Sequence, residues 1–324
     1  MIKLEDIRKP IREEMKEFDR RFKEAVSSHI PLLTVVTKYV LRRKGKQMRP
    51  LFVFLTSKLT GEVTESSYTA ASLIELMHTA TLVHDVVVDE SNERRGVFSV
   101  NAIWKAKVAV LFGDYLLARG LLLAVEKKDY DLLEIVSDTS REMSEGELLQ
   151  IQKSRSLNIN TDTYYEVIRK KTATLIASCT ACGAKSARAT QEVVDRVYEM
   201  GIQIGMAFQI KDDLFDYQPQ GLIGKPTGND IKEKKFTLPL IHALNQADAG
   251  VRRAMVKKIK NGKRSQRVVN EVVQFVHQMG GIEFANEKML EYKANAMEIL
   301  HSFPESPARD SLRDLVEFTV SRNK

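Results

Sequence analysis

Two pairs of aspartates, each spaced four residues apart at the end of an apolar segment, could bind a divalent metal. The first pair is Asp85 and Asp89, and the second is Asp212 and Asp216, with Asp213 beside them. A helix advances ~100° per residue, so residues i and i+4 share a face, where two like charges repel each other. A divalent cation compensates that repulsion, and paired carboxylates suit Mg²⁺, which retains waters and joins phosphates to a protein. We therefore expect the two motifs to face each other across a cavity and to hold magnesium.

The cations of the chain gather in a few short clusters, which indicate an anionic ligand. The sequence has 50 Lys and Arg against 43 Asp and Glu, a net charge of +7. The clustered residues are Arg42, Arg43, Lys44, Lys46, Arg49, Arg94, Arg95, Arg169, Lys170, Lys171, Lys232, Lys234 and Lys235. The chain lacks a helix-turn-helix, a zinc finger and an aromatic-rich sheet pattern, so we expect no nucleic acid. One interpretation is that these cations are solvated helix ends. Because two acidic motifs accompany them, we favour instead a ligand whose diphosphate is held by the cations above an apolar pocket. A prenyl diphosphate has a diphosphate and an apolar chain of this kind.

The elements that must position these residues are helices. Only 16 glycines and 8 prolines occur in 324 residues, which argues against a sandwich or barrel with many turns. Apolar residues recur at three- and four-residue spacing, and the segment 68–88 is apolar almost all round, as expected of a buried central helix. The expected helices cover 4–27, a segment ending near residue 43, 51–59, 68–88, 101–125, 131–153, 161–184, 191–216, 237–244, 251–259, 266–279, 282–300 and 308–321. We predict an all-α fold, with residues 1–324 as a single helical domain around a deep apolar tunnel.

Several classes of protein are excluded by what the chain lacks. It has no run of about 18 apolar residues, so no transmembrane segment is expected. The first residues carry acids and no apolar core, unlike a secretory signal, and we expect a cytoplasmic protein. Cys179 and Cys182 have a C-x-x-C spacing inside an apolar helical run, and we interpret them as buried core residues rather than a redox or zinc site.

Nine motifs, in order along essentially the whole chain, resemble those of the trans-isoprenyl diphosphate synthases, the polyprenyl synthetase family. Each is weak alone, whereas nine in order at the family spacing are specific. The motifs are Gly45-Lys46-Gln47-Met48-Arg49-Pro50, Glu75 through His78, the first acidic motif with Arg94-Arg95-Gly96, Gly113-Asp114-Tyr115-Leu116-Leu117, Gly146-Glu147 with Gln150, Lys171-Thr172, Phe208-Gln209 with the second acidic motif, Gly224-Lys225-Pro226-Thr227-Gly228-Asn229-Asp230, and Lys235-Phe236-Thr237-Leu238-Pro239.

The resemblance implies the prenyl synthase fold, a homodimer, and condensation of isopentenyl diphosphate head-to-tail onto an allylic prenyl diphosphate, with about three Mg²⁺ ions when substrate is bound. It implies that the Mg²⁺ ligands are Asp85, Asp89 and Asp212, supported through water by Asp213 and Asp216. The residues implied for the allylic diphosphate are Arg94, Lys171, Lys225 and Lys235. Those implied for isopentenyl diphosphate are Lys46, Arg49, His78 and Arg95. Thr172 and Gln209 are expected to face the reacting carbons and, with Lys171, to be catalytic.

The chain departs from the family pattern at two places. Val86 stands where the family has the second Asp of its first motif. Because Val86 lies ~100° around the helix from Asp85, it need not share the ligand direction, and we expect a working enzyme with weakened metal affinity. A catalytically weak partner subunit of a heteromeric synthase is the alternative. The second departure is Lys105-Ala106-Lys107, where the family usually reads Gly-Asn-Lys.

Product length should depend on the residues one and two turns before Asp85. These are Ala80, Thr81 and Met77. Short-chain relatives carry a bulky aromatic near the first two positions, and the small residues here predict a deeper tunnel and a product of about C30 to C50. A short-chain farnesyl or geranylgeranyl diphosphate synthase is the alternative, with Ala80 then a simple packing residue. A terpene cyclase would not need the isopentenyl diphosphate residues. Peripheral membrane contact for product release stays open.

Overall fold

The computed structural model describes residues 2–42, 45–88, 93–94, 97–156, 160–218, 228–233, 235–261 and 265–321. In chain order its helices are α1 (Leu4–Ile7), η1 (Lys9–Ile11), α2 (Arg12–Ala25), α3 (Pro31–Leu41), α4 (Met48–Thr60), α5 (Glu65–Val88), α6 (Val100–Lys127), α7 (Tyr130–Ser156), α8 (Thr161–Ile168), η2 (Arg169–Ala173), α9 (Thr174–Ser186), α10 (Gln191–Phe215), α11 (Asn229–Lys232), α12 (Leu238–Gln246), α13 (Ala249–Asn261), α14 (Gln266–Gln278), α15 (Gly281–His301) and α16 (Pro307–Ser321). One antiparallel pair of two-residue strands, β1 (Glu93–Arg94) and β2 (Val97–Phe98), follows α5. The all-α prediction is confirmed.

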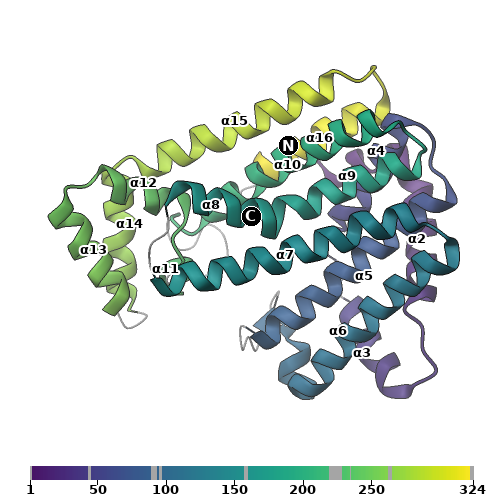
Figure 1. Cartoon of the computed structure of the whole chain (residues 1–324), viewed down its shortest axis with the longest axis horizontal. Coiled ribbons are helices and arrows are strands. Elements are labelled where there is room, and N and C mark those ends of the chain that lie inside the picture. The colour runs from purple at the N-terminus through teal and green to yellow at the C-terminus, as the bar shows by residue number, and fades with distance from the viewer. Residues whose placement is uncertain are drawn as a thin grey trace.

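Long helices form the body of the molecule, with α9 at its centre. Helix α9 packs against α4, α5, α7 and α10, and α15 covers the other side of α10. Helices α12, α13 and α14 gather at one end, on the left of Figure 1. One hydrophobic cluster contains residues of α2, α4, α5, α6 and α9, and a second contains residues of α12 and α14. Helix α10 contributes to both clusters, so it links the two parts of the core.

Two of the predicted helices are interrupted. The prediction of a single helix over 4–27 is wrong, because α1 ends at Ile7 and a 3₁₀ turn, η1, precedes α2. Pro10 lies in that turn, and proline lacks the N–H and crowds the preceding turn of an α-helix. The helix expected over 161–184 contains the π-helical turn η2, which separates α8 from α9. Such turns insert a residue into the helix and occur frequently at functional sites.

Helix α5 is the buried central helix expected over 68–88. Most of its residues from Ser67 to Ala80 are buried, whereas Asp85 and Val88 near its end are exposed. By length and composition alone, α5 and α6 could each cross a membrane. The buried core helices of soluble proteins meet the same criteria. More than half of the apolar window of α5 lies inside the structure.

Helix α6 bends at Lys105, the first residue of the second departure from the family pattern. Its φ of 68° and ψ of 164° lie in a region that only glycine occupies easily. A side chain in that region costs about 1–3 kcal/mol, because its Cβ crowds the backbone. The usual glycine of the family at this position therefore has a conformational reason.

Replacing Lys105 by glycine is expected to raise the free energy of unfolding by about 1 kcal/mol, since the relief of strain exceeds the entropy that glycine adds to the unfolded chain. Chemical denaturation of the wild type and the variant measures the difference. Lys107→Gly is the matched control, because Lys107 is exposed and lies within the helical part of α6. The control should lose about 1 kcal/mol. Equal losses in both variants would contradict strain at Lys105.

Candidate active site

The π-helical turn η2 and the last turns of α10 bring three predicted site residues into contact. The hydroxyl of Thr172 donates to Oε1 of Gln209 at 2.8 Å, and Nε2 of Gln209 donates to Oδ1 of Asp213, also at 2.8 Å. The close approach depends on Gly205 of α10, where a Cβ would lie 2.4 Å from the Cα of Ala173. Thus a side chain predicted to face the reacting carbons is joined, through Gln209, to the second acidic motif.

The second acidic motif concentrates negative charge in a buried place. Asp213 and Asp216 are both buried, and the backbone N–H of Asp230 donates to Oδ2 of Asp216 at 3.0 Å. Burial raises the pKa of Asp213, and the negative charges of Asp230 and Asp212 raise it further. Burial also raises the pKa of Asp230, with the charge of Asp216 as the next cause. Carboxylates that destabilise one another in this way fit a divalent cation, which would favour their ionised forms.

The metal site predicted from both motifs is not complete within the described part of the chain. Asp85, near the end of α5, is exposed, and Asp89 lies outside the described residues. Among the residues described, no three His, Cys, Asp or Glu side chains form a ready-made metal site. Val86 is only 5% exposed, so it points into the core while Asp85 points outward. Val86 and Asp85 therefore lie on different sides of α5, as the advance of ~100° per residue predicts.

Two of the lysines predicted for the allylic diphosphate form ion pairs with nearby glutamates. Lys171, in η2, pairs with Glu147 of α7 and lies 3.4 Å from Oε1 of Gln150. Lys235 pairs with Glu233 at 2.7 Å, and its backbone N–H donates to the carbonyl of Asp230. Both lysines are partly exposed, so an entering diphosphate could replace the glutamates as their partner. Of the other two residues predicted for this ligand, Lys225 lies outside the described residues, and only the backbone of Arg94 is described.

The residues predicted for isopentenyl diphosphate lie before and along α4 and on α5. Nζ of Lys46 lies 4.9 Å from the centre of the Phe318 ring, and the carbonyl of Lys46 accepts a hydrogen bond from Arg8. Arg49 belongs to the first turn of α4, and His78 is a buried residue of α5. Arg95 lies outside the described residues. The structure therefore describes three of these four residues, which belong to α4, to α5 and to the segment just before α4.

The three residues predicted to set product length line successive turns of α5. Ala80 and Met77 are buried, and Thr81 is half-buried, with its hydroxyl donating to the carbonyl of His78. They lie on the same helix as Asp85, toward the interior of the molecule.

The interpretation of the C-x-x-C pair as core residues is confirmed. Cys179 and Cys182 are buried and free. Burial raises the pKa of the Cys179 thiol to about 12, which makes it a poor nucleophile.

Two residues of the site are absent from the predicted set. Tyr164 of α8 donates its hydroxyl to Oδ2 of Asp213 at 2.7 Å, and Asp230 contacts Asp216. Asp230 ends the motif that begins at Gly224, so its position in that motif was a signal. Tyr164 lies seven residues before Lys171, which places it two helical turns away on a similar face. That spacing could have indicated Tyr164, although η2 changes the helical register between them.

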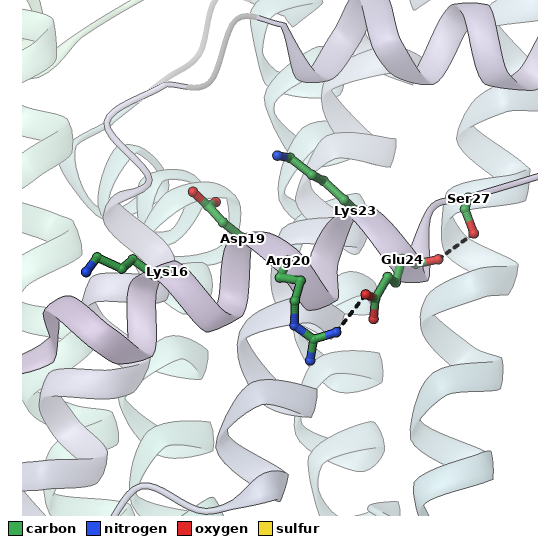
Figure 2. A pocket seen from close by; sticks show the side chains of 6 residues that line it. All are labelled: Lys16, Asp19, Arg20, Lys23, Glu24 and Ser27. Atoms are coloured by element: carbon green, nitrogen blue, oxygen red, sulfur yellow. Dashed lines mark hydrogen bonds and ion pairs between the residues drawn. The ribbon is translucent and has the colours of Figure 1, made fainter.

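A hollow beside α2 is a charged surface and not a second site. It is lined by Lys16, Asp19, Arg20, Lys23, Glu24 and Ser27. In the view of Figure 2, Asp19 and Lys23 extend upward from the helix, and Arg20 extends downward, where it pairs with Glu24 at 2.6 Å. These side chains do not converge on one point, and none of them belongs to the predicted site.

Comparison with known proteins identifies the family. The profile of the Polyprenyl synthetase family matches residues 30–276. The chain is 34% identical over 98% of its length to an all-trans-nonaprenyl-diphosphate synthase (geranyl-diphosphate specific) from Rhodobacter capsulatus, and covers 98% of that protein. It superposes with a TM-score of 0.91 on a polyprenyl synthase from Caulobacter crescentus complexed with calcium and isoprenyl diphosphate, at 30% identity and with 99% and 98% of the two chains covered. A geranylgeranyl pyrophosphate synthase from Bacteroides thetaiotaomicron gives a TM-score of 0.84 at 37% identity, with 98% of each chain covered. The chain therefore belongs to the polyprenyl synthetase family, and it is a prenyltransferase.

Proposed function

We propose that this prenyltransferase condenses isopentenyl diphosphate onto an allylic prenyl diphosphate to make an all-trans product of about C30 to C50. The observation that carries the product length is the pair of small residues, Ala80 and Thr81, one turn inward from Asp85 on α5. The similarity to a nonaprenyl diphosphate synthase supports it. A short-chain product is the second candidate, because a geranylgeranyl pyrophosphate synthase is also among the similar structures.

The substrates would be held through their diphosphates. Lys171 and Lys235 would exchange their glutamate partners for the allylic diphosphate. Arg94 and Lys225 would bind the same diphosphate. Lys46, Arg49, His78 and Arg95 would hold isopentenyl diphosphate beside it. Asp85, Asp89 and Asp212, supported by Asp213 and Asp216, would hold Mg²⁺, about three ions with substrate bound, which would neutralise the charge on the departing diphosphate.

The reaction would need little covalent work from the protein. Breakage of the allylic C–O bond leaves a carbocation, and the double bond of isopentenyl diphosphate attacks that carbon to form the new C–C bond. A proton is then lost, and the released diphosphate can accept it. Oxygen atoms of Thr172 and Gln209 would face the positive charge and stabilise it. Water must be excluded to protect the cation, and the apolar faces of the surrounding helices serve that purpose.

One assay tests this function against its alternatives. Purified protein is incubated with Mg²⁺, farnesyl diphosphate and labelled isopentenyl diphosphate, and the products are separated by length. Products of about C30 to C50 support the proposal, and products that stop at a single addition support the short-chain candidate. A cyclic hydrocarbon would indicate a terpene cyclase. Absence of turnover with farnesyl diphosphate, and also with geranyl diphosphate in its place, would indicate a partner subunit, as the Val86 departure allows.

Replacing Ala80 by phenylalanine is expected to shorten the product by several isoprene units, because the ring would block the space into which the chain grows. Product chromatography measures the change. Ala80→Ser is the control and should leave the length unchanged, since the side chain stays small. If Ala80→Phe does not fold, Thr81→Phe places the same ring on the adjacent, half-buried position. Unchanged length in an active phenylalanine variant would assign Ala80 a packing role only.

We also propose a homodimer formed through α6. This helix carries exposed large apolar residues along much of its length: Ile103, Val110, Leu111, Leu121, Leu122 and Val125. Contiguous apolar surface of this kind is usually covered by another protein chain. Light scattering of the purified protein measures the assembly.

We propose that residues 1–324 form one domain, since α10 contributes to both hydrophobic clusters. We further propose a cytoplasmic protein that has no transmembrane segment and binds no nucleic acid. Because its product is a lipid, we also propose peripheral membrane contact when the product is released. Cell fractionation measures the location.

A further inference from the structure

Tyr164 connects α8 to the second acidic motif through one buried hydrogen bond. The residue is 4% exposed, and its hydroxyl donates to Oδ2 of Asp213 at 2.7 Å. The other oxygen, Oδ1, accepts from Nε2 of Gln209. Both oxygens of this buried carboxylate are therefore held by protein donors, one from α8 and one from the preceding turn of α10.

The carboxylate gives the hydrogen bonds beyond it a direction. Tyr164 already donates to one oxygen of Asp213, and the NH₂ group of Gln209 faces and donates to the other. The carbonyl Oε1 of Gln209 then faces Thr172, and the Thr172 hydroxyl must donate to it. As a result, the lone pairs of the Thr172 oxygen, and not its proton, remain available on the side away from Gln209. A glutamine amide turned by 180° has nearly the same shape and would reverse this pattern.

We propose that Tyr164 is a positioning residue whose hydroxyl fixes Asp213 and, through it, the orientation of the Gln209 amide and the Thr172 hydroxyl. The inference rests on the proposed function, in which Thr172 and Gln209 face the allylic carbon as it becomes positive. In the fixed orientation both residues offer oxygen lone pairs to that charge, and in the reversed orientation Thr172 would turn its proton toward it. The benefit exists only in the transition state, so its loss lowers kcat and not substrate binding.

The neighbouring residue provides a matched control. Tyr165 belongs to the same helix, and its hydroxyl is buried but makes no hydrogen bond with any described residue. Tyr164→Phe and Tyr165→Phe therefore remove the same atom from adjacent positions, and only the first removes a hydrogen bond to Asp213. A structural role in packing alone would make the two variants behave alike.

The experiment measures kcat, the KM of each substrate and the Mg²⁺ dependence of chain extension for the wild type and both variants. We expect Tyr164→Phe to lower kcat about tenfold, with both KM values and the Mg²⁺ concentration for half-maximal rate within about twofold of wild type. Tyr165→Phe should stay within about twofold of wild type in every constant. Equal kcat in the two variants, or a loss confined to KM, overturns the proposal. A wild type that does not extend substrate overturns the proposed function and this inference together, whereas the other outcomes overturn the inference alone.

A second variant, Asp213→Asn, tests the same proposal without relying only on Tyr164→Phe being stable. Asparagine keeps the shape but presents an NH₂ group, so Gln209 is no longer forced into one orientation. If Tyr164 acts through Asp213, the kcat of the double variant Tyr164→Phe/Asp213→Asn should equal that of Asp213→Asn within about twofold. Losses that multiply in the double variant would show independent roles and overturn the proposal.

Discussion

Replacing Asp212 by alanine is expected to abolish chain extension, with kcat lowered at least about 100-fold. Asp212 lies in the last turn of α10, next to Asp213 and one turn before Asp216. Its negative charge contributes to the raised pKa values of both Asp213 and Asp230, so it acts on the same buried cluster. Removal of this carboxylate takes away a proposed Mg²⁺ ligand, and the diphosphate would then leave without the charge neutralisation that the reaction requires.

The stability of the same variant separates loss of a ligand from loss of the fold. Because the charge of Asp212 disfavours the ionised forms of Asp213 and Asp230, Asp212→Ala should leave the Tm of the metal-free protein unchanged or slightly higher. Asp195→Ala is the matched control, since Asp195 is an exposed aspartate in the first turns of α10 that accepts a hydrogen bond from Gln191. The control should extend substrate at the wild-type rate. Substantial residual activity in Asp212→Ala would refute the metal assignment.

The sequence predicts the long elements well, because burial imposes the same pattern along many turns. The expectation for α10, 191–216, differs from the observed helix by one residue, and that for α5 misses only its first turn. The paired aspartates and the nine motifs could be located because they are local in sequence. The sequence predicts a shared role for Thr172 and Gln209 but not their hydrogen bond, because the two residues lie 37 positions apart.

Departures from regular geometry are what the sequence does not reveal. Periodicity assumes one helix type, whereas η2 changes the register between Tyr164 and Lys171. The bend at Lys105 places a lysine in a backbone conformation that composition would never assign to it. Asp213 and Asp230 lie far apart in the sequence, so the effect of the Asp230 charge on the pKa of Asp213 requires the fold. Two of these features, η2 and the charge effect on Asp213, belong to the site, where a regular helix alone could not place the side chains.

Replacing Gly205 by alanine is expected to lower the free energy of unfolding by about 3 kcal/mol and to reduce kcat at least about tenfold. A Cβ at this position would lie 2.4 Å from the Cα and 2.8 Å from the Cβ of Ala173. The nearest atom belongs to backbone, so η2 and α10 must move apart to accept the methyl group. Thr172 is the residue before Ala173, and its 2.8 Å hydrogen bond to Gln209 spans the same seam. The separation that relieves the clash therefore also breaks the contact that positions Thr172.

The expected loss of about 3 kcal/mol follows from the position of the extra methyl group. Overpacking of a closely packed seam costs about 1–3 kcal/mol, and contact with backbone leaves no side-chain rotation to relieve it. Chemical denaturation and the extension assay measure the two losses. Gly250→Ala is the matched control, because no atom lies within 4 Å of a Cβ built there, at the start of α13. Alanine in a helix restricts the unfolded chain more than glycine does, so the control should be neutral or slightly more stable, with wild-type kcat. A Gly205→Ala variant as stable and active as Gly250→Ala would contradict the claim that the close contact between η2 and α10 builds the site.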